Sequence, residues 1–148
     1  MIKTFRGILA DGGQDRISLK TRKGKVGYRI IKFQIIQVEP GQQAVESTVK
    51  IYKQKQSTID NTVNFTDPNL LACAIWQKSD NSAYALTEAV IFDGQIVNQD
   101  IYVTHEESDN SYPCNYYIEM EAIHLDDKSA EYTTIKDLRG YTQMNPWR

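Results

Sequence analysis

The sequence is poor in the residues that usually signal covalent stapling or metal chemistry. Its 148 residues include two cysteines and two histidines. The cysteines, Cys73 and Cys114, are too few for a disulfide scaffold, and His105 and His124 lack the paired spacing of zinc ligands. No apolar run approaches the roughly 18 to 20 residues of a membrane helix. No apolar run follows the charges of residues 1–7 either, so we expect no secretory signal there.

Sequence signatures of catalysis are also missing. There is no G-x-S-x-G elbow, no P-loop and no G-x-G-x-x-G. Residues 11–15 (DGGQD) favour an ordinary turn, with a calcium loop as a minor alternative. Cys73 lies among apolar neighbours, which favours a buried thiol over an activated one. We therefore expect no catalytic residues, no cofactor and no metal, and hence a protein that is not an enzyme.

What the chain does contain is β-branched and aromatic side chains. It has 16 Ile, 8 Val, 11 Thr and 9 Tyr, against only 7 Leu and 9 Ala. β-Branched and aromatic residues fit the pleated surface of a sheet, whereas Leu and Ala are common in helices. The composition predicts an all-β fold.

Alternation and turn residues divide the chain into seven to nine strands. Residues 115–125 alternate apolar and polar side chains, which predicts a strand with one buried face. Residues 26–38 are apolar on both faces, which predicts a central strand buried on two sides or passing between sheets. Residues 86–93 and 96–105 predict two strands around a turn at 93–94. We expect an antiparallel β-sandwich, with a jelly roll as one form of it.

One or two short helices complete the prediction. Residues 69–76 fit either one or two helical turns or a strand. Residues 130–139 predict a short helix with Ile135 and Leu138 facing inward and Gly140 at its end. No repeat or low-complexity linker interrupts the chain, so we expect one sandwich domain over residues 1–140 and a tail over residues 141–148.

Charge is distributed unevenly along the chain. Residues 1–56 hold 12 basic and 4 acidic residues, whereas residues 57–148 hold 5 basic and 15 acidic residues. The run 16–32 has seven basic residues and no acid. The first interpretation is an exposed hairpin whose charges are partly balanced by acidic strands folded beside it. The alternatives are docking onto an acidic protein surface, including another copy, and nucleic-acid binding, which we consider the weakest because only Tyr28 offers a stacking ring there.

Two groups of residues are candidates for contact with a partner. Arg22, Lys23 and Lys25 lie at the expected hairpin tip. Tyr141, Met144 and Trp147 follow the last expected element and either fold back onto the sandwich or insert into a neighbour. Tyr buries a large area at a low entropy cost, so such residues suit protein contacts.

Several segments together carry a resemblance. KTFRGILADGGQDRI (3–17), GYRIIKF (27–33), VKIYKQKQSTID (49–60), IVNQDIYVTH (96–105) and CNYYIEME (114–121) resemble a group of small proteins encoded by marine bacteriophages and uncultured viruses. The resemblance extends from about residue 3 to residue 139. It implies a virion structural protein and carries no catalytic residues to transfer.

These observations lead to a functional hypothesis with open alternatives. We expect a non-enzymatic phage virion protein, a capsid decoration or minor capsid component that stabilises neighbouring subunits. Its partners would be other virion proteins, the major capsid protein first, with many copies or a homo-oligomer on the particle. We expect no membrane contact and assembly in the host cytoplasm, where few disulfides form.

Two alternatives remain open. The first is a tail, connector or fibre-associated adaptor of the particle. The second is a glycan-binding jelly-roll module in which Trp76, Tyr84, Tyr112 or Tyr116 is exposed and stacks on sugars.

Overall fold

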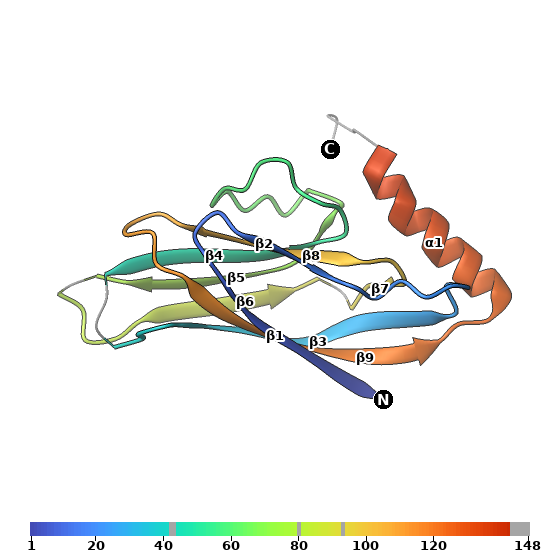
Figure 1. The fold of residues 1–148 in the computed structure, drawn as a ribbon, viewed down its shortest axis with the longest axis horizontal. Coiled ribbons are helices and arrows are strands. Elements are labelled where there is room, and N and C mark those ends of the chain that lie inside the picture. The colour runs from blue at the N-terminus through green and yellow to red at the C-terminus, as the bar shows by residue number, and fades with distance from the viewer. Residues whose placement is uncertain (42–43, 80, 93, 143–148) are drawn as a thin grey trace.

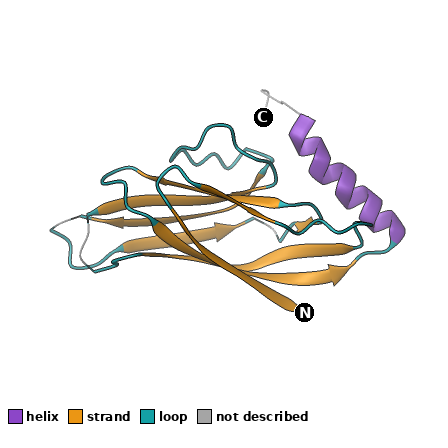
Figure 2. Cartoon of the chain, viewed as in Figure 1, coloured by secondary structure: helices purple, strands orange, loops and turns teal. Residues whose placement is uncertain are grey.

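The computed structural model describes residues 1–41, 44–79, 81–92 and 94–142, which form two facing antiparallel sheets and one helix (Figure 1; Figure 2). The strand order is β1-β9-β3-β7 in the first sheet and β2-β8-β4-β5-β6 in the second. This confirms the predicted antiparallel β-sandwich. The elements are β1 (Ile2–Leu9), β2 (Gln14–Ile17), β3 (Val26–Gln37), β4 (Val45–Tyr52), β5 (Leu70–Lys78), β6 (Leu86–Ile91), β7 (Ile96–Val97), β8 (Ile101–Glu107), β9 (Cys114–His124) and α1 (Asp127–Thr142).

Strand β9 organises the first sheet because it pairs along its length with both β1 and β3. Its side chains alternate as predicted: Tyr116, Ile118 and Met120 are buried against the second sheet, and the residues between them are only partly buried. Strand β3 differs from the prediction. Ile31 and Ile36 are exposed on its outer side, so β3 is buried on one face only.

The second sheet is buried more deeply than the first. Seven of the eight residues of β4 are buried, including polar Thr48 and Lys50. The long connection from β4 to β5, residues 53–69, lies over the outer face of this sheet (Figure 1). The outer face of the second sheet is therefore covered, whereas the outer face of the first sheet is open to solvent.

Three strands differ from the sequence-based boundaries. The ambiguous segment 69–76 is a strand, β5. The segment 86–93 is strand only as far as Ile91. The segment 96–105 is divided into β7 and β8, and between them Asp100 Oδ1 accepts the backbone N–H groups of Leu19 (2.9 Å) and Lys20 (3.0 Å). The break between β7 and β8 therefore places Asp100 where it binds the β2–β3 connection.

Helix α1 is longer than predicted, and the side that was expected to face the sandwich faces solvent instead. Asp126 caps its start, because its Oδ1 accepts the backbone N–H of Ser129 at 2.7 Å. The helix continues past Gly140 to Thr142. Ile135 and Leu138 are exposed, so the prediction that they face inward is wrong. The helix lies at one end of the sandwich, and the connections β5–β6 and β8–β9 lie at the other (Figure 1).

Gly7 provides a test of how closely β1 and β9 approach. A Cβ at Gly7 would lie 2.8 Å from the Tyr116 hydroxyl oxygen, and that hydroxyl donates to Asp15 Oδ2 at 2.8 Å. We expect Gly7→Ala to lower the free energy of unfolding by about 1–3 kcal/mol, because the ring must move. Gly41→Ala is the matched control, since its Cβ would meet nothing within 4 Å. Urea denaturation measures both, and equal effects would contradict the close contact.

Candidate interaction surface

Helix α1 is fixed to the sandwich by a buried polar contact centred on Asn98. This residue is fully buried directly after β7. Its Nδ2 lies 2.9 Å from Gly24 O, 3.2 Å from Ala130 O and 2.6 Å from Thr134 Oγ1. Its backbone N–H donates to Asp137 Oδ2 at 2.9 Å. Thus the side of α1 that faces the sandwich is largely polar.

The opposite side of α1 carries three large apolar side chains among exposed charged residues such as Lys128 and Glu131. Tyr132, Ile135 and Leu138 are 69%, 58% and 52% exposed. Their spacing of three residues keeps them on one side of a helix over two turns. Beside Tyr132 runs an open groove of about 720 Å³, which Leu125 and Ile96 also line. The helix therefore presents to solvent the side chains that an ordinary surface helix buries.

The predicted basic tip lies next to this helix. Gly24 O contacts Asn98, and Lys25 Nζ forms an ion pair with Asp127 Oδ1 at 2.8 Å. Arg22 and Lys23 are exposed. Among the residues that the structure describes, no ion pair involves Lys20, Arg22 or Lys23.

We call the combination of these features the α1 surface, and it comprises Tyr132, Ile135, Leu138, Lys20, Arg22 and Lys23. It combines part of the basic tip with apolar residues of α1 that are more than 100 positions away in the sequence. Tyr141 belongs to the last turn of α1, whereas Met144 and Trp147 lie outside the described residues.

The remaining basic run is balanced as the first interpretation expects. Acidic residues from the second half of the chain lie beside it. The ion pairs are Arg16–Asp100 (3.7 Å), Arg29–Glu121 and Lys32–Glu119 (4.0 Å). Such exposed pairs contribute about 0–1 kcal/mol each, so their effect is mainly to remove net charge from this part of the surface.

Ser47 and His105 form a pair that resembles the start of a catalytic triad. His105 Nδ1 lies 3.1 Å from the carbonyl oxygens of Leu9 and Ala10, so in the neutral ring it carries the proton. Its Nε2 then accepts from Ser47 Oγ at 3.0 Å, and the Gln37 amide donates to the same Oγ. Ser47 and His105 are both buried. The pair therefore serves to satisfy polar groups inside the core.

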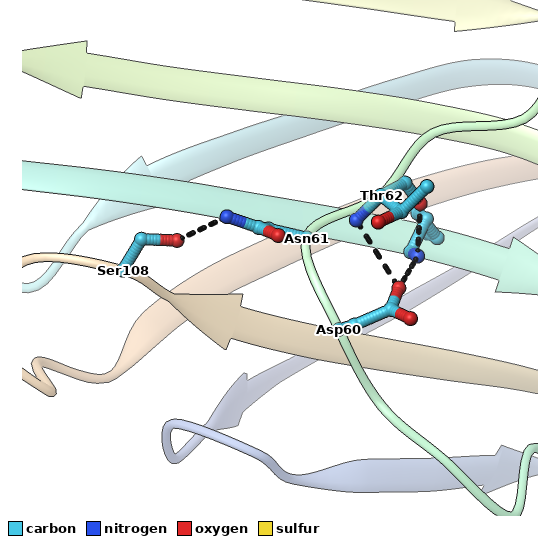
Figure 3. A network of polar contacts seen from close by, with 5 residues as sticks. Asp60, Asn61, Thr62 and Ser108 are labelled. Carbon is cyan, nitrogen blue, oxygen red and sulfur yellow. Dashed lines mark hydrogen bonds and ion pairs between the residues drawn. The ribbon is translucent and has the colours of Figure 1, made fainter.

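A second polar network holds the connection 53–69 on the second sheet. The Lys50 side chain is 3% exposed, and its Nζ contacts Asp60 Oδ1 at 3.0 Å and donates to Thr62 O at 2.6 Å (Figure 3). Asn61 Nδ2 donates to Ser108 Oγ at 2.7 Å. Burial alone would lower the pKa of Lys50, but Tyr52 and Asp60 raise it overall. The ammonium therefore stays charged and acts as a clamp. No local pattern in the sequence marks Lys50.

Both thiols are free and buried. Burial raises the pKa of Cys73, although the Lys50 charge opposes this effect, and burial raises the pKa of Cys114 to about 12. The two acids of the 11–15 turn have separate partners: Asp11 Oδ1 accepts the N–H of Glu107, and Asp15 accepts the Tyr116 hydroxyl. In the described part of the chain, no three His, Cys, Asp or Glu side chains are grouped closely enough to hold a metal ion.

The aromatic residues proposed to stack on sugars are in different environments. Tyr116 is buried, so its predicted exposure is wrong. Tyr84 is 84% exposed, and Trp76 and Tyr112 are partly buried. They come from separate strands and connections. Within the described ranges, no helix is both long and apolar enough to cross a membrane.

Comparisons with known proteins add no assignment. No protein-family model matches the chain, and no curated protein matches it.

The core network around Ser47 yields a stability prediction. We expect Ser47→Ala to lower the free energy of unfolding by about 1–3 kcal/mol, because the Gln37 amide and His105 Nε2 lose their buried partner. Ser18→Ala, at an exposed position, is the control and should change it by less than about 0.5 kcal/mol. Urea denaturation gives both values. A neutral Ser47→Ala would show that the network is dispensable.

Asp137 yields a pH prediction for the docking of α1. Burial raises its pKa, although the hydrogen bond from Asn98 and the charges of Lys136 and Lys53 oppose this effect. The stabilisation from protonated Asp137 is therefore fully present below its ordinary pKa of 3.8 and is lost as the pH rises through the higher folded value.

Asp137→Asn keeps an oxygen for the Asn98 N–H and removes the buried charge. We expect it to increase the protection of α1 amides at pH 7 and to reduce the gain that the unaltered chain shows between pH 7 and pH 4, as about 1.4 kcal/mol is lost per unit of pKa shift. Hydrogen exchange, corrected for intrinsic rates, measures this. The same pH dependence in both chains would show that Asp137 is not responsible.

Proposed function

We propose that this protein is a non-enzymatic structural component of a virus particle that binds neighbouring protein subunits through the α1 surface. Within the particle, we propose the role of a capsid decoration or minor capsid component. The observation that carries this proposal is the orientation of α1, whose polar side is anchored on Asn98 and whose apolar side faces solvent.

The energetics favour a partner for this helix. Burying a Tyr, Ile or Leu side chain contributes about 1.5–3 kcal/mol each, and Tyr132, Ile135 and Leu138 leave much of this unused in the isolated chain. Rotating the helix to bury them would break the contacts of Asn98 with Thr134 and Asp137. A second protein that covers the apolar side gains the burial and leaves these contacts intact.

The charges around the helix indicate the chemistry of that partner. Exposed Lys20, Arg22 and Lys23 lie on the β2–β3 connection, which reaches α1 through the Lys25–Asp127 ion pair, so a basic segment adjoins the helix that carries the apolar side chains. Interfaces commonly combine an apolar centre with a polar rim, and complementary charge accelerates encounter. We propose an acidic, partly apolar surface on another virion protein, the major capsid protein first.

The strand order supports the jelly-roll form of the sandwich. If β6 is treated as an added edge strand, the sheets β1-β9-β3-β7 and β2-β8-β4-β5 have the interleaved order of two Greek keys. Jelly rolls occur in viral capsid and lectin domains. A fold alone assigns no function, so this support is secondary to the α1 surface and adds to the resemblance to phage proteins.

Binding to particles tests the proposal. We expect the purified chain to bind shells that lack it, and Ile135→Ser with Leu138→Ser to weaken binding about 100-fold, the size expected for losing some 3 kcal/mol of apolar burial. Ile2→Ser with Ile8→Ser is the matched control, because these residues are 50% and 54% exposed on β1. Co-sedimentation with shells measures the affinities.

Two results would contradict the proposal. The first is no binding of the chain to shells, and the second is an equal loss of affinity in the two double variants. Arg22→Glu with Lys23→Glu should slow association and reduce its salt dependence. Imaging of particles with the labelled chain distinguishes the capsid role from a tail, connector or fibre adaptor.

A further inference from the structure

One wall of the open groove beside α1 is a row of two lysines with a tyrosine between them. The row consists of Lys128, Tyr132 and Lys136, which follow one another at intervals of four residues along one side of the helix. The groove has a volume of about 720 Å³, within the range of about 300–1,000 Å³ that is typical of ligand sites. The other lining residues are Gly94, Ile96, Leu125, Ser129 and Thr133.

Between the two lysines, the groove is lined by apolar side chains. Leu125 is buried in the connection from β9 to α1, and Ile96 begins β7, against which the helix packs. Tyr132 is 69% exposed and lies about one helical turn from each lysine. In the described part of the chain, β7 is the last strand of its sheet, so no further strand of that sheet covers Ile96. A ligand in the groove would meet apolar side chains between two ammonium groups.

The two lysines have no acidic partner in the described part of the chain. Among the described residues, no ion pair involves Lys128 or Lys136, and these two are the only charged residues of the lining. Lys136 Nζ donates to Ile96 O at 3.0 Å, which uses one of its three N–H donors and holds the ammonium group beside β7. Glu131 follows Lys128 by three residues on α1 but does not line the groove. The charge of the lining is therefore positive.

Acidic residues next to the groove are paired with other cations. Asp127 forms an ion pair with Lys25 at 2.8 Å. Glu121 forms an ion pair with Arg29, and the Arg29 side chain lies next to Gly94 in the groove lining. These acids are therefore already engaged and leave the charge of the two groove lysines uncompensated. The groove is complementary in charge to a negatively charged ligand with an apolar part.

The spacing of the lysines determines the spacing of the charges that would match them. Lys136 follows Lys128 by eight residues, which is about 12 Å along a helix axis. An extended peptide advances about 3.3 Å per residue and places every second side chain on the same face. Carboxylates four residues apart therefore lie about 13 Å apart on one face, with one further side chain midway between them. An apolar side chain at that middle position would meet Tyr132 and Leu125.

The chain itself does not contain this pattern of acid, apolar residue and acid. Only two pairs of its acidic residues are four positions apart, Asp11–Asp15 and Asp127–Glu131. The residue midway is Gly13 in the first pair and Ser129 in the second, so neither pair flanks a large apolar side chain. The pattern therefore indicates a different protein as the source of the segment, and not a second copy of this chain.

We infer that the groove between α1 and β7 binds an extended acidic segment of a neighbouring protein, in which two carboxylates four residues apart flank an apolar side chain. One carboxylate pairs with Lys128 and the other with Lys136, while the apolar side chain packs on Tyr132 and Leu125. This inference rests on the proposed function, because that function supplies the partner, another virion protein. The chemistry of the groove is measured without any particle, so the two fail separately.

A short peptide added to the full chain tests the groove. The probe is Ser-Asp-Ser-Leu-Ser-Asp-Ser with blocked ends, and its control is Ser-Asp-Asp-Leu-Ser-Ser-Ser, which has the same composition. We expect the probe to shift the methyl resonances of Ile96 and Leu125 and to bind more weakly as salt is added. The control reaches only one lysine and should bind about threefold more weakly. A probe with Asn in place of both Asp should bind about tenfold more weakly.

Two double variants distinguish the groove from the overall charge of the chain. Lys128→Gln with Lys136→Gln removes both ammonium groups and keeps an amide donor for Ile96 O. We expect this variant to bind the probe about tenfold more weakly. Lys55→Gln with Lys78→Gln is the matched control, since it removes the same charge from positions that do not line the groove, and it should change the affinity by less than about twofold.

Each other outcome overturns the inference. Unmoved resonances of Ile96 and Leu125 would exclude binding in the groove, and equal affinity for the probe and its control would exclude a role for the spacing. Equal loss in the two double variants would show attraction by net charge alone. Tighter binding of octanoate or of a short single-stranded DNA would assign the groove to a lipid or a nucleic acid. If the change at Lys136 loosens α1, the peptide variants decide. Shell binding through Ile135 and Leu138 is measured separately, so a chain that binds shells but not the probe leaves the proposed function in place.

Discussion

The hydrogen bonding of Asn98 fixes the orientation of the helix on which the proposed interface depends. One buried amide contacts the β2–β3 connection through Gly24 and the helix through Ala130 and Thr134, while its backbone N–H contacts Asp137. Buried polar groups tolerate few alternative partners. The helix therefore has one favourable rotation about its axis, and in that rotation the apolar side chains are exposed. The same amide also binds Gly24 O and so holds the basic tip next to the helix.

In the folded chain, basic segments of the first half pair with acidic segments of the second half. Basic β3 lies beside acidic β9, and Arg29 and Lys32 meet Glu121 and Glu119 there. A basic first half and an acidic second half thus become a nearly neutral sheet face. Exposed Lys20, Arg22 and Lys23 on the β2–β3 connection form no ion pair with the described residues, and this charge can influence how the molecule meets other proteins.

The fold could be predicted from the sequence because its strands follow local alternation. The pattern of Tyr116, Ile118 and Met120 identifies β9 without any knowledge of its partners. The orientation of α1 could not be predicted in this way. Hydrophobic periodicity assumes that a helix packs through an apolar side, whereas the surface that α1 meets is polar. The structural roles of Lys50 and Asn98 could not be predicted either. Their roles depend on groups 10 to 74 positions away, which no local spacing reveals.

Of the candidate site, the sequence identified Arg22, Lys23 and Lys25 by their clustered charge but not their position next to a helix. Tyr132 was missed, although its spacing to Ile135 and Leu138 was visible, because the stripe fits a buried side equally well.

The polar attachment of α1 also gives the two parts of the molecule different responses to temperature. Exposure of apolar surface makes unfolding heat capacities large and stability curves strongly bent. The sandwich, with its core of Ile, Val and aromatic side chains, falls in that class. Detaching α1 exposes mainly hydrogen-bonding groups, so its heat-capacity change is small and its free energy varies almost linearly with temperature. Cooling therefore destabilises the sandwich core before it destabilises the attachment of α1.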